Sequence, residues 1–147
     1  MADEVKKESA TPVETKVKKP LIKKGAKKKT IQQVSHGRAY VHATFNNTII
    51  TLTDANGNTL AWASSGHCGF KGPKKATPYA AGVVVKAVVE KVAPYGLQEV
   101  NVFLQGVGSG RDAAVRAFNA NGLTVLSIKD MTPLPHNGCR LPRARRI

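Results

Sequence analysis

The chain has 147 residues, enough for one domain with a hydrophobic core, and its 23 Lys and Arg against 9 Asp and Glu give a formal net charge of +14. No apolar run is long enough to span a membrane, and the N-terminus lacks both the apolar segment of a secretory signal and the arginines of a transit peptide. We therefore expect a cytoplasmic protein with no membrane partner and with reduced thiols at its two cysteines, Cys68 and Cys139.

Most of the positive charge lies at the two ends of the chain. Residues 1–29 hold ten lysines and four acidic residues, whereas residues 129–147 hold five basic residues and one acidic residue. Dense cationic charge beside a small domain indicates a polyanionic partner, usually nucleic acid, because phosphate contacts release counterions. We predict a disordered, lysine-rich extension (1–34), an α/β domain (35–130) and an extended tail rich in proline and arginine (131–147).

The first part of the domain has the pattern of three short strands. Residues 38–45 alternate apolar side chains, the last of them Phe45, with Tyr40, His42 and Thr44, which is the period of a β-strand. The β-branched run 48–53 and the segment 59–64 predict two more strands, joined by a tight turn at 54–58 in which Gly57 tolerates a positive φ. Strands connected this closely form an antiparallel meander.

The second part alternates helices with strands. Thr77 is a suitable N-cap and Pro78 a suitable first residue for a helix that Pro94 and Gly96 end, and a narrow polar stripe predicts that most of this helix is buried. That stripe consists of Gly82, Lys86 and Glu90.

A strand over 99–105, a helix from near Gly110 to Gly122 and a strand over 123–130 complete the pattern. The order strand, strand, strand, helix, strand, helix, strand predicts an α/β fold. Its five-stranded mixed sheet is a meander continued by two crossover units, with the helices packed on the sheet.

Two loops that lead into helices are candidate anion sites. Glycines 106, 108 and 110 separate a predicted strand from a predicted helix, which exposes backbone N–H groups near a helix N-terminus. The turn is not a Walker loop, because Arg111 stands where that motif needs lysine, and a tight structural connection is the alternative. Loop 65–78 carries three lysines, and if both loops lie at one edge of the sheet they form a composite phosphate surface. The alternative is that the three lysines are ordinary solvent-exposed charges on a loop.

Zinc binding and catalysis have weaker support. His67, Cys68, His136 and Cys139 include zinc-ligand types, but two of them are adjacent and the paired spacing of structural zinc sites is absent. No recognisable spacing places a base to activate Cys68. Metal-dependent nuclease chemistry needs clustered carboxylates, and the few carboxylates of the predicted domain form no such cluster in the sequence. We predict no enzymatic activity, no cofactor and no metal.

Four blocks of the sequence point to one family. They read NNTIITLTD, SSGHCGFKGPKKATPYAA, GSGRDAAVRAF and SIKDMTPLPHNGCRLPRARRI. From about Gly37 to Ile147 the chain closely resembles the family of the eleventh protein of the small ribosomal subunit, in its bacterial form. It departs from that pattern at Pro73, at Gly82 and in its longer, more lysine-rich N-terminal extension.

The resemblance implies a ribonuclease-H-like fold without the nuclease carboxylates, and a structural role in the ribosome. It implies a place on the platform of the small subunit near the mRNA exit, with the domain bound to 16S-type rRNA. Small-subunit proteins six and eighteen, and often twenty-one, would be neighbours. An RNA-processing enzyme on the same scaffold and a free RNA chaperone are the alternative functions.

The prolines of the tail keep it extended, so its arginines are expected to make located contacts with folded rRNA. Asn137 precedes Gly138 in this tail and is the predicted site of isoaspartate formation, because glycine shields the side-chain amide poorly. The predicted rRNA-binding residues are Lys71, Lys74, Lys75, Gly108, Ser109, Gly110, Arg111, Arg116, His136, Asn137, Arg140, Arg143, Arg145 and Arg146.

Overall fold

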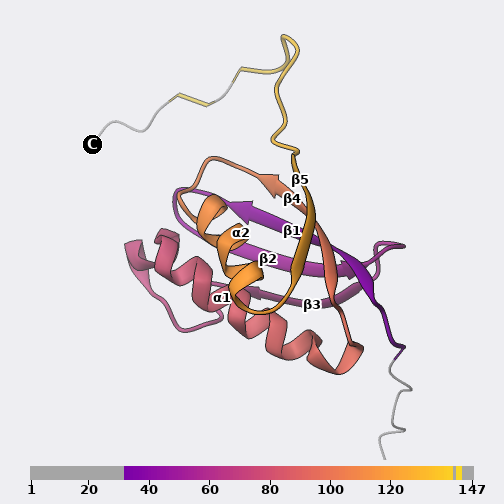
Figure 1. Cartoon of the computed structure of the whole chain (residues 1–147). Coiled ribbons are helices and arrows are strands. Elements are labelled where there is room, and N and C mark those ends of the chain that lie inside the picture. Colours follow the sequence, from indigo (N-terminus) through magenta and orange to yellow (C-terminus); the bar gives the residue numbers. More distant parts are fainter. Residues whose placement is uncertain (1–31, 141, 144–147) are drawn as a thin grey trace, which may run out of the picture.

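The computed structural model describes residues 32–140 and 142–143, and its strands and main helices lie between His36 and Asp130 (Figure 1). The predicted disorder of residues 1–34 falls almost wholly outside the described residues. The strands are β1 (His36–Ala43), β2 (Thr48–Asp54), β3 (Thr59–Ser64), β4 (Glu99–Gln105) and β5 (Thr124–Asp130). The helices are α1 (Pro78–Val92) and α2 (Gly110–Ala120), with short 3-10 helices η1 (Gly72–Ala76) and η2 (Ala93–Tyr95).

The five strands form one mixed sheet in the order β3-β2-β1-β4-β5. β1, β2 and β3 pair antiparallel as the predicted meander, while β4 pairs parallel with β1 and β5 parallel with β4. α1 and α2 are the crossover connections that parallel pairing requires. The α/β class, the mixed sheet and the element order predicted from the sequence are confirmed.

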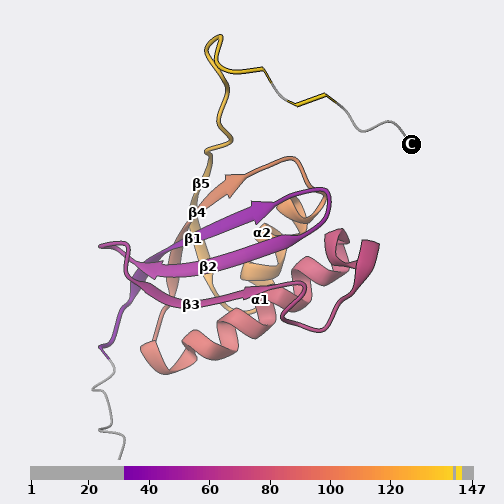
Figure 2. The ribbon, with the colours of Figure 1, turned by 180° about the vertical axis from the view of Figure 1, so that it is seen from behind.

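Both helices pack on the same face of the sheet, and the opposite face is uncovered in Figure 2. The core between the two layers holds Val84, Val85 and Val88 of α1 and Phe118 of α2, all fully buried. They contact the alternate strand residues that face the helices, among them Ile50. We call the side of the sheet that the helices leave uncovered the open face.

The ends of α1 follow the predicted signals. The Oγ1 of Thr77 accepts a hydrogen bond from the N–H of Ala80 (3.2 Å), and Pro78 is the first helical residue. α1 ends at Val92, and η2 then leads to Gly96. Lys86 and Glu90 are exposed, as the predicted polar stripe requires, and the valines of the opposite side are buried.

One strand end was predicted wrongly. β1 stops at Ala43 rather than at residue 45, because residues 44–47 form a turn in which the Oγ1 of Thr44 accepts from the N–H of Asn47 (3.0 Å). Phe45 was expected to alternate with the buried residues, but it lies at the turn and is 77% exposed. A side-chain-to-backbone bond of this kind competes with strand pairing, and the apolar alternation gives no sign of it.

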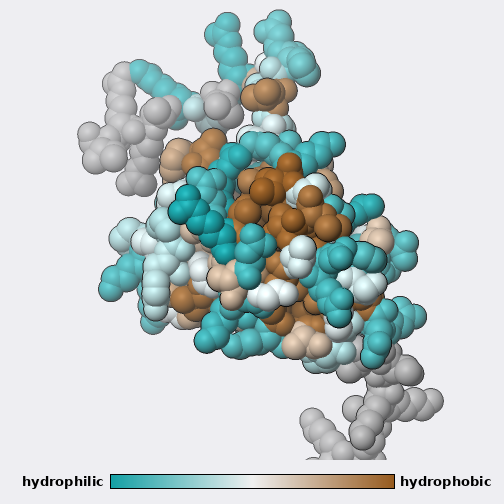
Figure 3. Space-filling model, in the orientation of Figure 1, coloured by the Kyte–Doolittle hydropathy of each residue, from teal (hydrophilic) through white to brown (hydrophobic). Residues whose placement is uncertain are grey.

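The edge strand β5 is much more exposed than its apolar sequence suggests. Val125 is partly buried against the core, but Leu126 and Ile128 are each more than half exposed, as is Met131 just after the strand. Leu126, Ile128 and Met131, which we call the apolar strip, belong to the brown area over β5 in Figure 3. Among residues 32–140, no helix is both long enough and apolar enough to cross a bilayer.

Candidate nucleic-acid interface

The candidate loops meet at one edge of the sheet. β1, β3, β4 and β5 run in the same direction, so their carboxyl ends lie together, and open α/β sheets bind ligands at this edge. Three connections lie there: turn 44–47, the lysine loop (65–77) and the glycine turn (106–110). We call these three segments the loop end. The Oγ of Ser109 donates to the carbonyl of Ala76 (2.8 Å), so the lysine loop and the glycine turn lie at one edge and are in direct contact.

The lysine loop presents its cations beside the start of α1. Lys71 and Lys74 are exposed and Lys75 is partly exposed. The loop is held in place from its end, because the Oγ1 of Thr77 donates to the carbonyl of Lys74 (2.9 Å) while it caps α1. The lysine positions are therefore fixed relative to a helix N-terminus, whose partial positive charge adds to theirs.

The glycine turn serves the packing of the protein itself. The N–H of Gly106 donates to the Oγ1 of Thr132 (3.1 Å), and the N–H of Gly108 donates to the carbonyl of Ala43 (3.0 Å). A Cβ on Gly106 would lie 2.2 Å from the carbonyl oxygen of Ala43, and one on Gly108 would lie 2.4 Å from that of Thr44. The expectation that this turn exposes its amides to an anion is wrong for these two N–H groups, because both are bonded within the protein.

Arg111 connects the glycine turn to the end of β5. Its guanidinium donates to the carbonyl of Gly106 (2.5 Å) and pairs with the carboxylate of Asp130 (2.5 Å). Hydrogen bonds from Thr132, and then the bond and charge of Arg111, lower the pKa of Asp130 below its ordinary value near 3.8. A contact between Arg111 and phosphate stays a prediction, but the geometry gives this side chain a bridging role that the sequence did not suggest.

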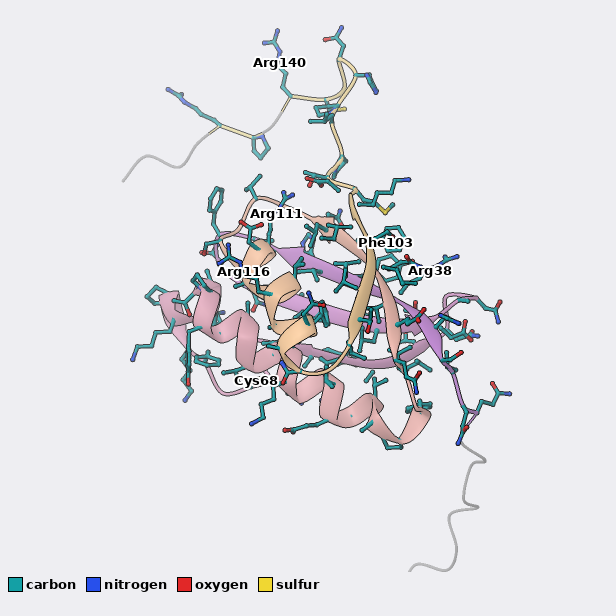
Figure 4. All side chains as sticks on the ribbon, in the orientation of Figure 1. Arg38, Cys68, Phe103, Arg111, Arg116 and Arg140 are labelled. Atoms are coloured by element: carbon teal, nitrogen blue, oxygen red, sulfur yellow. The ribbon has the colours of Figure 1, made fainter. Side chains whose placement is uncertain are left out.

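Arg116 lies farther along α2 and is exposed, whereas Arg111 is only partly exposed (Figure 4). In the described part of the chain Arg116 takes part in no ion pair, so its charge is available to a partner.

The tail leaves the domain from the loop end. Its first residue is anchored, because the N–H of Met131 donates to the carbonyl of Leu104 (2.8 Å), and the N–H of Thr132 donates to the carboxylate of Asp130 (2.9 Å). Beyond this point the described residues extend away from the domain (Figure 1), without helix or strand. His136, Asn137, Arg140 and Arg143 are exposed there, while Arg145 and Arg146 lie outside the described residues.

The described residues contain no group of three or more His, Cys, Asp or Glu side chains that could hold a metal ion. Cys68 is half-buried and packs against the core cluster, whereas Cys139 is exposed in the tail. The structure therefore does not bring the zinc-ligand types near residue 67 together with those near residue 137.

Sequence reasoning missed two exposed features. One is the apolar strip on β5. The other is a stacked aromatic pair on the open face, in which the rings of Tyr40 and Phe103 are 5.2 Å apart and inclined by 18°. The alternation in the two strands placed both rings on one face, but it did not show which face the helices leave uncovered.

The comparison with protein families agrees with this geometry. The model of the family described as ribosomal protein S11 matches residues 37–146. The match covers all five strands apart from His36, both helices and nearly all of the tail, and it begins after the lysine-rich extension.

Proposed function

The chain belongs to the ribosomal protein S11 family, and from this premise we propose how it holds its place in the small ribosomal subunit. Family membership makes it a structural constituent of that subunit, an rRNA-binding protein that takes part in translation. We propose in addition that it sits on the platform near the mRNA exit, supports assembly there, and contacts 16S-type rRNA beside small-subunit proteins six and eighteen, and often twenty-one. The order of the five strands supports the proposal that its fold is ribonuclease-H-like.

The observation that carries the rRNA proposal is the convergence of cationic segments at the loop end. The hydrogen bond from Ser109 to Ala76 joins the two loops, and the tail begins at the neighbouring end of β5. An RNA backbone that runs across this edge would meet the lysine loop, then the exposed Ser109 just before α2, and then the tail. Neutralising its phosphates releases counterions, which supplies affinity without base-specific contacts.

The two kinds of cationic segment act differently in this proposal. The lysines of the loop act as point charges on phosphates, because an ammonium group has no fixed planar geometry. The arginines of the tail all follow Pro135, and three of the four follow Pro142; they can bond phosphate through two N–H groups or stack on bases. The prolines limit the conformations of the tail before binding, which lowers the entropy cost of ordering it.

Filter binding of the full chain to small-subunit rRNA across a salt series tests this proposal. With six to ten phosphates neutralised, affinity should fall by about 10³- to 10⁵-fold between about 50 and 200 mM salt. Changing Lys71, Lys74 and Lys75 to Gln should reduce the slope of log affinity against log salt by roughly three. The matched control, Lys86→Gln on the exposed stripe of α1, should leave it unchanged, and a flat response of the wild-type protein would refute the proposal.

Two further assays separate the alternative functions. An RNA-processing enzyme would cleave structured RNA when divalent metal is added, and we expect no cleavage. A free RNA chaperone would be washed off small subunits by high salt, whereas a constituent should co-sediment with them in stoichiometric amount. Metal-dependent cleavage would favour the RNA-processing enzyme, and loss of the protein from the washed subunits would favour the free chaperone; either result would contradict the structural role.

A further inference from the structure

The open face of the sheet carries an ordered array of polar and aromatic side chains on β1, β4 and β5. Cross-strand pairing places Arg38, Asn101 and Ser127 in one row, and Tyr40, Phe103 and Lys129 in the next. His42 and Gln105 form a third row at the carboxyl end. In β1 and β4 the residues that alternate with them are buried in the core under the helices, so the array lies on the open face. We call these three rows the open-face array.

The centre of the array is a hollow beside the aromatic pair. Tyr40 and Phe103 stack on each other and are only partly buried. A cavity of about 220 Å³ lies against them and is lined also by His42, Gln105 and Met131. A hollow with an aromatic side, an amide and an imidazole offers both a stacking surface and hydrogen-bonding groups.

Charge on the array favours an anionic partner. Arg38 lies one row from Phe103 (Figure 4), and Lys129 lies directly beside Phe103 on β5. No carboxylate stands in the three rows. Glu99 is one row before them, and its carboxylate is paired with the imidazole of His36 (2.9 Å).

We propose that the open-face array binds an unpaired base of the small-subunit rRNA, with the base stacked in the hollow beside Phe103 and Tyr40. This inference rests on the proposed rRNA-binding function and adds a second contact surface to the loop end. Gln105 and His42 are placed to bond the edge of the base, and Arg38 and Lys129 to contact the flanking phosphates. A sheet face with exposed aromatics and surrounding cations suits single-stranded RNA, whose bases have stacking faces and whose backbone is anionic.

A protein segment suits this face less well. Edge-to-edge strand addition would use the backbone of β5 or β3 rather than the face of β1 and β4. A cationic segment would be repelled by Arg38 and Lys129, with no carboxylate in the rows to balance them. An RNA strand satisfies both the cations and the aromatic hollow.

The test uses the full chain and protein-free small-subunit rRNA. Tyr40→Leu with Phe103→Leu keeps apolar side chains on the sheet but removes the stacking surface. Affinity should fall by about 5- to 150-fold at every salt concentration, the range expected for one stacked base, while the salt slope stays that of the wild type. Changing the loop lysines should instead alter the slope, so the two kinds of contact are distinguished.

Trp62→Leu is the matched control, because Trp62 is an exposed aromatic in the same cross-strand row, but it lies on β3, two strands from Tyr40, and does not line the hollow. It should bind rRNA like the wild type, and circular dichroism should show that all variants are folded. Gln105→Ala, at an exposed position, gives a second variant that does not alter packing, and it should lower affinity by about 2- to 10-fold.

Ultraviolet cross-linking of reconstituted small subunits locates the contact directly. A nucleotide should be attached to the peptides that contain Tyr40 or Phe103, and none to the peptide that contains Trp62. Wild-type affinity of the double leucine variant, equal loss with Trp62→Leu, or a neighbouring protein rather than RNA cross-linked to the array would overturn the inference. Failure of the wild type to bind rRNA would refute the proposed function instead, so the two failures are distinguishable.

Discussion

Gly108→Ala adds one methyl group to the glycine turn and tests why that turn needs glycine. The N–H of Gly108 donates to the carbonyl of Ala43 (3.0 Å), and its new Cβ would lie 2.4 Å from the carbonyl oxygen of Thr44. That oxygen belongs to the backbone, so no side-chain rotation relieves the contact. The turn after β1 would have to move by about 1 Å to reach ordinary contact distance.

The cost of this movement can be worked from its two parts. Overpacking of this size costs about 1–3 kcal/mol, and weakening the hydrogen bond to Ala43 adds about 1 kcal/mol. We expect the free energy of unfolding to fall by about 2–4 kcal/mol, which lowers the melting temperature by roughly 10–20 °C for a domain of this size.

Urea titration of the purified variant, followed by circular dichroism, measures this difference. Two other Gly→Ala variants are matched controls, since an added Cβ meets nothing within 4 Å at either position. Gly57→Ala in the β2–β3 turn should cost about 1 kcal/mol through its positive φ of 94° alone, while Gly82→Ala inside α1 should stabilise by about 0.5–1 kcal/mol. A Gly108→Ala protein as stable as Gly57→Ala but poor in rRNA binding would show that the turn serves a ligand rather than packing.

Three further results are expected. Asp130→Asn should lower stability at neutral pH, and because the pKa of Asp130 is lowered in the folded protein, the difference from wild type should shrink in urea titrations as pH falls from about 5 toward 2. Deleting residues 137–147 should impair incorporation into reconstituted subunits more than deleting residues 1–29, because arginines on a proline-stiffened segment make located contacts; equal defects would contradict this. Peptide mapping of fresh subunits should find isoaspartate chiefly at Asn137, whereas an intact Asn137, or more modification at Asn56 or Asn121, which also precede glycine, would contradict this prediction.

The sequence predicted the elements well because its local signals agree with the packing. Thr77 and Pro78 mark the start of α1, the alternation of apolar and polar residues marks β1, and a β-branched run marks β2. The mixture of antiparallel and parallel pairing followed from chain connectivity, since parallel strands need crossovers and adjacent antiparallel strands need only turns. These signals lie in residues that are close together in the chain, so they can be read from a single sequence.

The site was predicted less completely because its details depend on distant segments. Nothing local shows that Arg111 reaches Asp130, nineteen residues later, or that Gly108 lies against the turn after β1. Likewise, the strands that contain Tyr40 and Phe103 become neighbours only when the sheet has formed. Sequence patterns found the cationic loops, but contacts across the fold decide which of their groups are free to bind.

The apolar strip has a consequence for the protein before it reaches the ribosome. β5 pairs with β4 on one side, and on the other side no strand of the described part of the chain pairs with it. An exposed edge with Leu126 and Ile128 on its surface is a template for another copy, and Lys129 is the only lysine on the strand to discourage strand addition. Copies made in excess of rRNA should therefore self-associate or be degraded, so the supply of RNA sets how much of this protein a cell can keep in soluble form.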